Sequence, residues 1–316
     1  MDISIVIPVY NEEGNLGELH RRISTVLEGL GRSYEIVFID DGSVDSSFEV
    51  LRKIASGDNA VRVIKFRRNF GQTAAFAAGF KYARGGTIIT MDADLQNAPE
   101  DIPKLLAKID EGWDVVSGWR KNRKDKFLTR ILPSVLANKL ISRITGVRLH
   151  DYGCTIKAYR GEIAKNIELY GQMHRFIPAL ARWVGASVTE IVVAHHPRKH
   201  GRSKYGLFRT VNVILDLITV KFLMSYSTRP IQIFGLVGFG SGVIGLVMFL
   251  YALYERQVYL IPMGNRPMFF LSVLLFIVGV QFISMGLLSE LQVRTYHESQ
   301  NKPVYSVKEI IGGDGE

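Results

Sequence analysis

Short apolar runs alternate with stretches of helical periodicity over about the first two hundred residues. The runs are rich in β-branched residues and are only four to seven residues long, as is typical of buried strands. They are Ile3–Val9, Tyr34–Ile39, Val61–Phe66, Thr87–Met91 and Asp114–Ser117. Between them, apolar residues recur every three or four positions, which predicts helices near 16–30, 46–55 and 72–83 and another from Pro99. This alternation predicts an α/β fold whose mostly parallel sheet has helices on both faces.

The C-terminal third has a different pattern. Ile231–Leu253 and Met268–Leu288 contain no charged residue over 23 and 21 positions. A helix of that length extends about 35 Å, enough to cross a hydrocarbon core of about 30 Å. We therefore expect a two-helix transmembrane hairpin over 229–290. A pair of buried core helices is the alternative interpretation.

Basic residues flank the hairpin on the outside. Lys221 and Arg229 precede it, and Arg294 and Lys302 follow it. The positive-inside rule places both ends in the cytoplasm, so we expect a two-pass protein of the inner membrane whose N-terminal domain faces the cytoplasm. The remaining boundaries would be this N-terminal α/β domain over 1–205 and a cytoplasmic C-terminal tail over 291–316.

Residues 206–228 are apolar but carry a polar stripe. Arg209, Asn212, Asp216 and Thr219 are spaced by three or four positions, so they would share one helix face. This pattern favours an amphipathic helix in the membrane interface. A third spanning segment is the alternative.

Charge and composition narrow the possible partners. The net charge is +9, and much of it lies in two clusters near the expected membrane-facing region. One cluster comprises Arg120, Lys121, Arg123, Lys124, Lys126 and Arg130, and the other Arg198, Lys199, Arg202, Lys204 and Arg209. We assign them to membrane lipid headgroups and phosphate rather than to nucleic acid. The single cysteine, Cys154, excludes an internal disulfide.

Acidic turns follow two of the predicted strands. Asp40-Asp41-Gly42-Ser43 comes after one strand, and Asp92-Ala93-Asp94 comes after another. Ligands of parallel sheets bind at the carboxyl ends of the strands, so both turns are candidate site elements. No G-x-G-x-x-G follows the first strand and no G-x-x-x-x-G-K-[ST] is present, which argues against a dinucleotide-binding dehydrogenase and a P-loop NTPase.

The D-x-D triplet favours a metal site. On an extended segment, Asp92 and Asp94 point to the same side, and their hard oxygens suit Mg²⁺ or Mn²⁺ bridging to substrate phosphates. Gln96 would add a polar contact, and the ion would neutralise charge on a departing nucleoside diphosphate. A carboxylate at Asp40 or Asp41 would accept hydrogen bonds from a base or ribose, although an ordinary turn has the same composition.

The order of several motifs resembles a known family. IVIPVYNEE, FIDDGSVDSS, RNFGQTAAFAAGF and MDADLQNAPEDIP resemble glycosyltransferase family 2 with its GT-A fold. SGWR, DYGCTIKAYR and HGRSKYG, followed by two apolar helices, resemble its polyprenyl-phosphate glycosyltransferase branch, which includes bactoprenol glucosyltransferases and dolichol-phosphate mannose synthases. DYGC is closer to the bacterial bactoprenol and formamido-arabinose types.

The resemblance implies a role for each matching residue. Residues expected to bind the nucleotide-sugar are Pro8, Tyr10, Glu12, Asp40, Asp41, Asp92 and Gln96. Residues expected to bind the metal, Mg²⁺ or Mn²⁺, are Asp92, Asp94 and Gln96. Residues expected to bind the acceptor phosphate are Arg120, Arg130, Ser134, Arg202 and Lys204. Residues expected to take part in catalysis are Asp94, Arg120, Arg202 and Asp151, the last as an orienting carboxylate or simply a turn residue.

The implied reaction transfers one sugar, with inversion, from a nucleotide-sugar to a polyprenyl phosphate. The acceptor phosphate has a second pKa of about 6, so it needs positioning rather than a strong general base. UDP-glucose is the first donor that the resemblance suggests, with other UDP-sugars or GDP-mannose as alternatives. A processive polysaccharide synthase, an inactive membrane scaffold and a D-x-D phosphotransferase are rival interpretations, and a homo-oligomer is compatible with the anchor.

Overall fold

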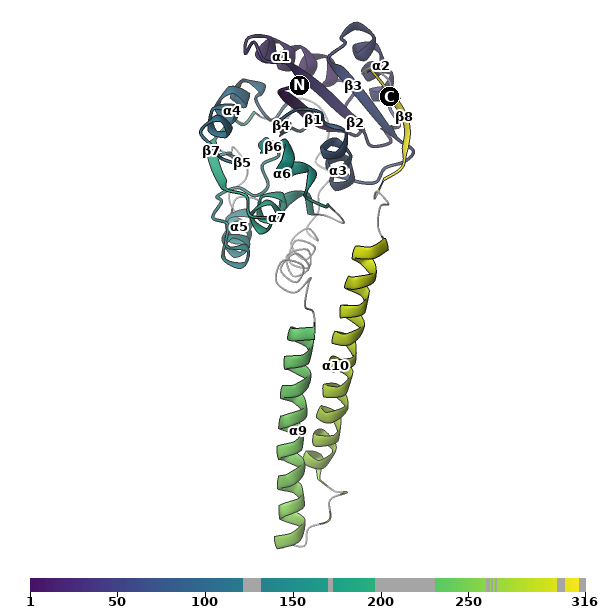
Figure 1. Ribbon diagram of the computed structural model, residues 1–316, viewed down its shortest axis with the longest axis vertical. Helices are drawn as coiled ribbons and strands as arrows, with labels where there is room; N and C mark the ends of the chain where they lie inside the picture. The colour runs from purple at the N-terminus through teal and green to yellow at the C-terminus, as the bar shows by residue number, and fades with distance from the viewer. Residues whose placement is uncertain are drawn as a thin grey trace. The chain divides into compact units, whose positions relative to one another are not determined.

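The computed structural model describes residues 1–121, 132–169, 173–196, 231–259, 262, 264, 266–299 and 305–312. The chain forms two compact units (Figure 1). One contains residues 1–220 together with 303–316, and the other contains residues 221–302. The predicted interfacial helix at 206–228 and the basic residues Arg130, Arg202 and Lys204 lie outside the described residues.

An eight-stranded sheet forms the centre of the first unit, in the order β7-β5-β6-β4-β1-β2-β3-β8. The strands are β1 Ile3–Val9, β2 Tyr34–Asp40, β3 Val61–Phe66, β4 Thr87–Thr90, β5 Val115–Trp119, β6 Lys157–Arg160, β7 Val188–Val192 and β8 Val307–Ile311. β4, β1, β2 and β3 are mutually parallel, β5 pairs in parallel with β7, and β6 and β8 are antiparallel to their neighbours. The predicted GT-A type of mostly parallel sheet is therefore confirmed, with antiparallel additions.

Helices cover both faces of this sheet. They are α1 Leu16–Glu28, α2 Ser47–Gly57, α3 Gln72–Tyr82, α4 Ile102–Asp110, α5 Leu132–Thr145, α6 Gly161–Lys165 and α7 Ile177–Trp183, with 3-10 turns at Pro99–Asp101 and Met173–Arg175. Apolar residues of α1, α2 and α4 share one buried cluster with Ile3, Ile5 and Ile7 of β1. α3 packs against the other face, where a Cβ on Gly79 would come within 2.1 Å of Val6. Successive side chains of β1 thus point to opposite faces of the sheet and pack against different helices.

β8 corrects the assignment of 291–316 to a separate cytoplasmic tail. Its Ile311 pairs with Val63, and its Glu309 pairs with Lys65 at the edge of the sheet. This pairing is stabilising because β3 would otherwise be an edge strand with unpaired backbone groups. Sequence reasoning missed it because V-K-E-I-I is too short to be recognised next to a long helix.

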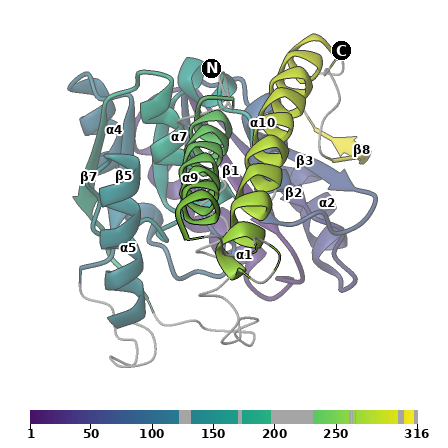
Figure 2. The ribbon, with the colours of Figure 1, turned by 90° about the horizontal axis from the view of Figure 1, so that it is seen from below.

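The second unit is a helical hairpin. α9 spans Ile231–Tyr259 and α10 spans Pro267–Ser299, so both helices are longer than the uncharged stretches that predicted them. They lie side by side (Figures 1 and 2) and approach closely at glycines, since a Cβ on Gly238 would meet the Gly279 carbonyl oxygen at 2.6 Å. Most of their apolar side chains are exposed, as suits lipid and not a soluble core.

Candidate active site

The predicted site residues gather at one edge of the first unit's sheet. β1, β2 and β4 are parallel, so Asp40 at the end of β2 lies at the same edge as Tyr10 and Asp92, which follow β1 and β4. β5 has the same direction because β6 is antiparallel to both β4 and β5, and this brings Arg120 to that edge. The start of β6 lies there too, with Lys157 opposite Thr90. The site therefore follows from strand direction.

Asp41 stabilises a loop. Its Oδ1 accepts a hydrogen bond from the Phe70 amide at 2.7 Å, and its Oδ2 accepts one from the Gly71 amide at 2.9 Å. Both oxygens of this buried carboxylate thus hold the loop that leads into α3. These bonds give Asp41 a positioning role, and its predicted contact with a base or ribose stays a prediction.

Asp40 differs from Asp41 in the hydrogen bonds that its carboxylate accepts. Its Oδ1 accepts a hydrogen bond from the Ser43 amide at 3.1 Å, while its buried Oδ2 has no hydrogen-bond partner among the described residues. Burial raises the pKa of this carboxyl above its ordinary value. A buried acceptor without a donor is costly, so Oδ2 is suited to a ligand N–H or O–H.

The turns after β1 and β2 are joined by hydrogen bonds. The Asn11 amide donates to the Ser43 hydroxyl at 3.1 Å, and the Glu12 amide donates to the Ser47 hydroxyl at 2.8 Å. Glu12 also accepts a hydrogen bond from Asn15 Nδ2 at 2.6 Å. Pro8, two residues before Tyr10, pairs in register with Ile39. The predicted nucleotide-sugar residues of β1 and β2 therefore lie together.

Two donors hold the first carboxylate of the D-x-D turn. Gln72 Nε2 donates to Asp92 Oδ1 at 2.8 Å, and Thr155 Oγ1 donates to Asp92 Oδ2 at 2.5 Å. Asp94, which is buried, accepts a hydrogen bond at Oδ1 from the Gln96 amide at 3.1 Å. Burial and the nearby charge of Asp94 raise the pKa of Asp92 to about 6. The turn holds two carboxylates that repel each other.

This donor set fits a divalent cation. Two close carboxylates favour a cation that takes its remaining ligands from substrate phosphates and water, as Mg²⁺ commonly does. Among the described residues no group of three or more His, Cys, Asp or Glu side chains is arranged to hold a metal ion. Asp92 and Asp94 would therefore hold the ion only together with the substrate.

Gln96 contacts the end of the described segment that precedes the second basic cluster in the sequence. Its backbone carbonyl accepts a hydrogen bond from the His196 amide at 2.9 Å, and its Nε2 lies 3.5 Å from the His196 carbonyl oxygen. Asn97 forms a β-bridge with His195. The predicted metal contact of Gln96 remains a proposal, and the D-x-D turn is joined to the segment just before 197–205.

Thr155 provides the first prediction. Thr155→Val removes a hydrogen bond that lowers the pKa of Asp92, so this pKa should rise and the ionised form should appear only at higher pH. If transfer needs that ionised form, kcat should fall about tenfold near pH 6 and change little near pH 8. The measurement is a pH–rate profile, with Thr155→Ser as the matched control that keeps the hydroxyl. Parallel profiles for the valine variant and the wild type would contradict this role.

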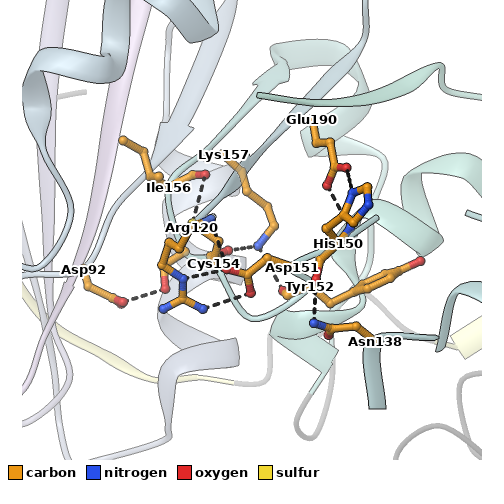
Figure 3. Close-up of polar contacts among 11 residues, drawn as sticks. Asp92, Arg120, Asn138, His150, Asp151, Tyr152, Cys154, Ile156, Lys157 and Glu190 are labelled. Atoms are coloured by element: carbon orange, nitrogen blue, oxygen red, sulfur yellow. Dashed lines mark hydrogen bonds and ion pairs between the residues drawn. The ribbon is translucent and has the colours of Figure 1, made fainter. Parts of the chain in front are cut away.

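Arg120, which is partly exposed, forms a bidentate pair with the buried Asp151. Nε of Arg120 donates to Oδ2 of Asp151 at 2.7 Å, and Nη2 donates to Oδ1 at 3.0 Å. The guanidinium lies between Asp92 and Asp151 (Figure 3). Asp151 therefore orients the arginine that we predicted to bind phosphate.

Neighbouring elements fix the residue before Asp151. The His150 amide donates to Glu190 of β7 at 2.9 Å, and Asn138 Nδ2 of α5 donates to the His150 carbonyl at 2.7 Å. The His150 ring stacks on Trp119 with centroids 4.2 Å apart. These contacts hold the Asp151 segment against the end of β5. Ser134, also predicted at the acceptor, lies in α5.

Lys157 is a buried cation that contacts the loop after Asp151. Its Nζ donates to the carbonyl oxygens of Tyr152, at 3.3 Å, and Cys154 (Figure 3). Burial lowers the pKa of this amine. Lys157 thereby holds the loop that presents Thr155 to Asp92.

Three site residues were missed by sequence reasoning: Gln72, Thr155 and Lys157. Gln72 and the DYGCTIK segment are in motifs that carried the resemblance, but nothing in their spacing shows which carboxylate they contact. Those contacts depend on α3 and on the antiparallel β6.

Comparison with known proteins places this geometry in a family. The sequence profile of Glycosyl transferase family 2 matches residues 4–168. The chain belongs to that family. The dodecaprenyl-phosphate galacturonate synthase of Rhizobium johnstonii is 44% identical over 98% of this chain and 93% of that protein. The undecaprenyl-phosphate 4-deoxy-4-formamido-L-arabinose transferase of Shewanella sediminis is 42% identical over 99% and 93%. This glycosyltransferase is thus similar to polyprenyl-phosphate sugar transferases.

Solved structures support the fold of the catalytic unit. Glucosyl-3-phosphoglycerate synthase from Mycobacterium tuberculosis, in complex with Mn²⁺, UDP and phosphoglyceric acid, aligns with a TM-score of 0.55 at 18% identity, over 71% of this chain and 78% of that one. Mannosyl-3-phosphoglycerate synthase from Rubrobacter xylanophilus aligns with a TM-score of 0.55 at 16% identity, over 70% and 74%. At these identities the likeness concerns the fold alone.

Proposed function

We propose that this glycosyltransferase transfers a single sugar from a nucleotide-sugar to a polyprenyl phosphate. The observation that carries the proposal is the position of the Arg120–Asp151 pair beside Asp92, the first carboxylate of the D-x-D turn (Figure 3). The Arg120 guanidinium suits a phosphate monoester, and the aspartates of the D-x-D turn suit a diphosphate with its cation. The relatives that match almost the whole chain are named for polyprenyl phosphates, which supports this acceptor.

Each of these residues has a separate role in the proposed transfer reaction. An oxygen of the acceptor phosphate attacks the anomeric carbon, the bond from that carbon to the donor diphosphate breaks, and the nucleoside diphosphate leaves. Attack from the opposite side inverts the anomeric configuration. Arg120, oriented by Asp151, holds the acceptor phosphate. Asp92 and Asp94 would hold a divalent ion, which would offset the charge on the leaving group. Because the acceptor is already ionised at neutral pH, no side chain has to remove a proton.

The donor we propose to test first is UDP-galacturonate. The relative from Rhizobium johnstonii is named for galacturonate, and the one from Shewanella sediminis for 4-deoxy-4-formamido-L-arabinose, which makes that sugar the second choice. Neither name supports UDP-glucose, the first expectation from the sequence. For the base, the buried Asp40 Oδ2 would accept a hydrogen bond from an N–H group such as that of uracil.

The membrane arrangement we propose is two-pass, with both ends on the cytoplasmic side. Since β3 and β8 belong to one sheet, the chain between them crosses a membrane an even number of times. α9 and α10 satisfy this requirement, whereas a third crossing within 206–228 would not. The basic flanks favour the cytoplasmic side for the catalytic unit.

A transfer assay tests the proposed function. Purified protein in detergent is mixed with polyprenyl phosphate, Mg²⁺ or Mn²⁺ and a panel of radiolabelled UDP- and GDP-sugars, and label is followed into the organic phase. We expect label from one donor, one sugar per lipid, and loss of transfer with EDTA. No lipid-linked label from any donor, or the appearance of polymer, would refute the proposal in favour of a different acceptor or a processive synthase.

A further inference from the structure

The strand that follows the membrane hairpin reaches beyond the end of β3. Within β8, Val307 pairs with Phe66, the last residue of β3. The contact continues past both strands, because the Arg67 amide donates to the Ser306 carbonyl at 3.1 Å. β8 therefore contacts the start of the loop over 67–71, which we call the donor loop.

Tyr305 extends this contact through its ring. Its side chain is buried, and its ring stacks on that of Phe66 with centroids 5.2 Å apart and planes at 12°. Phe66 in turn meets Phe70 of the donor loop edge-to-face, with centroids 5.7 Å apart. The Tyr305 hydroxyl is buried without a hydrogen-bond partner among the described residues, so the ring and not the hydroxyl accounts for its packing.

The acidic turn after β2 holds the other side of the donor loop. Asp41 accepts hydrogen bonds from the amides of Phe70 and Gly71. Gly42 is so close to the loop that a Cβ there would lie 2.5 Å from the Arg68 carbonyl carbon. The donor loop is thus held between the Asp40-Asp41-Gly42 turn and β8.

The donor loop joins the two parts of the proposed donor site. Through Arg68, Phe70 and Gly71 it contacts the turn that carries Asp40, whose buried Oδ2 has no hydrogen-bond partner among the described residues. The loop then leads directly into Gln72, whose side chain donates to Asp92. A displacement of the loop would therefore disturb both Asp40, the carboxylate proposed to bind the base, and Asp92, the carboxylate proposed to bind the metal ion.

We propose that Tyr305 is a positioning residue for donor binding: from the segment after the membrane hairpin, its ring fixes the donor loop through Phe66 and Phe70. The inference rests on the proposed function, because it assumes that this sheet edge binds a nucleotide-sugar. It gives the segment after α10 a role in donor affinity that is independent of membrane attachment.

The test compares Tyr305→Ala with Tyr305→Phe in the full-length protein in detergent. We expect Tyr305→Ala to raise the KM for the donor and the Kd for UDP about tenfold, with the acceptor KM and kcat changed by about twofold or less. Tyr305→Phe keeps the ring and should match the wild type within about twofold. Glu309→Gln is the control on the same strand, since Glu309 makes only a partly exposed ion pair with Arg52 at 3.5 Å.

Hydrogen exchange provides a readout that a general loss of stability would not reproduce. The amides of Phe70 and Gly71 should exchange faster in Tyr305→Ala than in Glu309→Gln, while the strand amides of β1 keep their protection. If the alanine variant does not purify as a folded protein, Tyr305→Leu serves the same test, because it keeps apolar volume and loses the stacked ring.

The outcomes separate this inference from the proposed function. Unchanged UDP affinity and unchanged exchange in a folded Tyr305→Ala or Tyr305→Leu protein would overturn the inference alone. A loss in Tyr305→Phe as large as that in Tyr305→Ala would overturn the role of the ring. Wild-type protein that binds neither UDP nor GDP would refute the proposed function, and the inference with it.

Discussion

Asp94→Asn should lower kcat for sugar transfer by about a thousandfold, because the site would lose one of its two metal-facing carboxylates. Asparagine has nearly the same shape, and its side-chain oxygen can still accept the hydrogen bond that the Gln96 amide gives to Asp94 Oδ1. The variant should therefore fold normally. The measurement is kcat at saturating donor and acceptor, with thermal unfolding followed in parallel.

The control for this variant is Asp110→Asn. Asp110 makes an exposed ion pair with Arg32 at 2.7 Å and lies at the end of α4, so its loss should leave kcat unchanged. A titration with Mn²⁺ adds a second comparison, since Asp94→Asn should need more metal for any residual activity. An Asp94→Asn enzyme with more than about a tenth of wild-type kcat would contradict the metal assignment.

Arg120→Ala should raise the KM for polyprenyl phosphate by about 30-fold, with a much smaller change in the donor KM. The guanidinium is the largely buried cation that we propose to bind the acceptor phosphate. Its removal also takes the bidentate hydrogen bonds away from the buried Asp151 carboxylate, so the variant should lose about 3 kcal/mol of stability. Steady-state kinetics in both substrates and thermal unfolding measure the two effects.

Two further variants separate binding from stability. Arg120→Lys keeps the charge but loses the bidentate geometry, so its acceptor KM should lie between those of the wild type and Arg120→Ala. Arg160→Ala breaks another arginine–carboxylate pair, with Asp114 at 3.1 Å, at the far end of β6. It should lower stability without changing the acceptor KM. An equal rise in acceptor KM for Arg160→Ala would mean that Arg120 acts only through stability.

Features encoded by local pattern could be predicted from the sequence. The β-branched runs gave β1, β2 and β3 at nearly their observed bounds, because buried parallel strands need continuous apolar residues. The uncharged stretches indicated α9 and α10. The position of Asp40 and Asp92 at one edge followed from strand direction.

Features that depend on distant partners could not be predicted. Arg120 and Asp151 are 31 residues apart in sequence, and nothing near either residue shows that they pair. The hydrogen bonds that Asp41 accepts from the amides of Phe70 and Gly71 join residues about 30 positions apart, and no local pattern indicates them. β8 was missed because its pairing with β3 depends on the chain returning after two apolar helices.

The pairing of β8 with β3 has a consequence for biosynthesis. The ribosome makes β3 first, then both apolar helices, and only then β8. Until β8 arrives, β3 presents an open edge with unpaired backbone groups, which is prone to association with other chains. Completion of the catalytic sheet must therefore follow synthesis of the hairpin, so a failure of membrane insertion would leave a nascent enzyme that is exposed to aggregation.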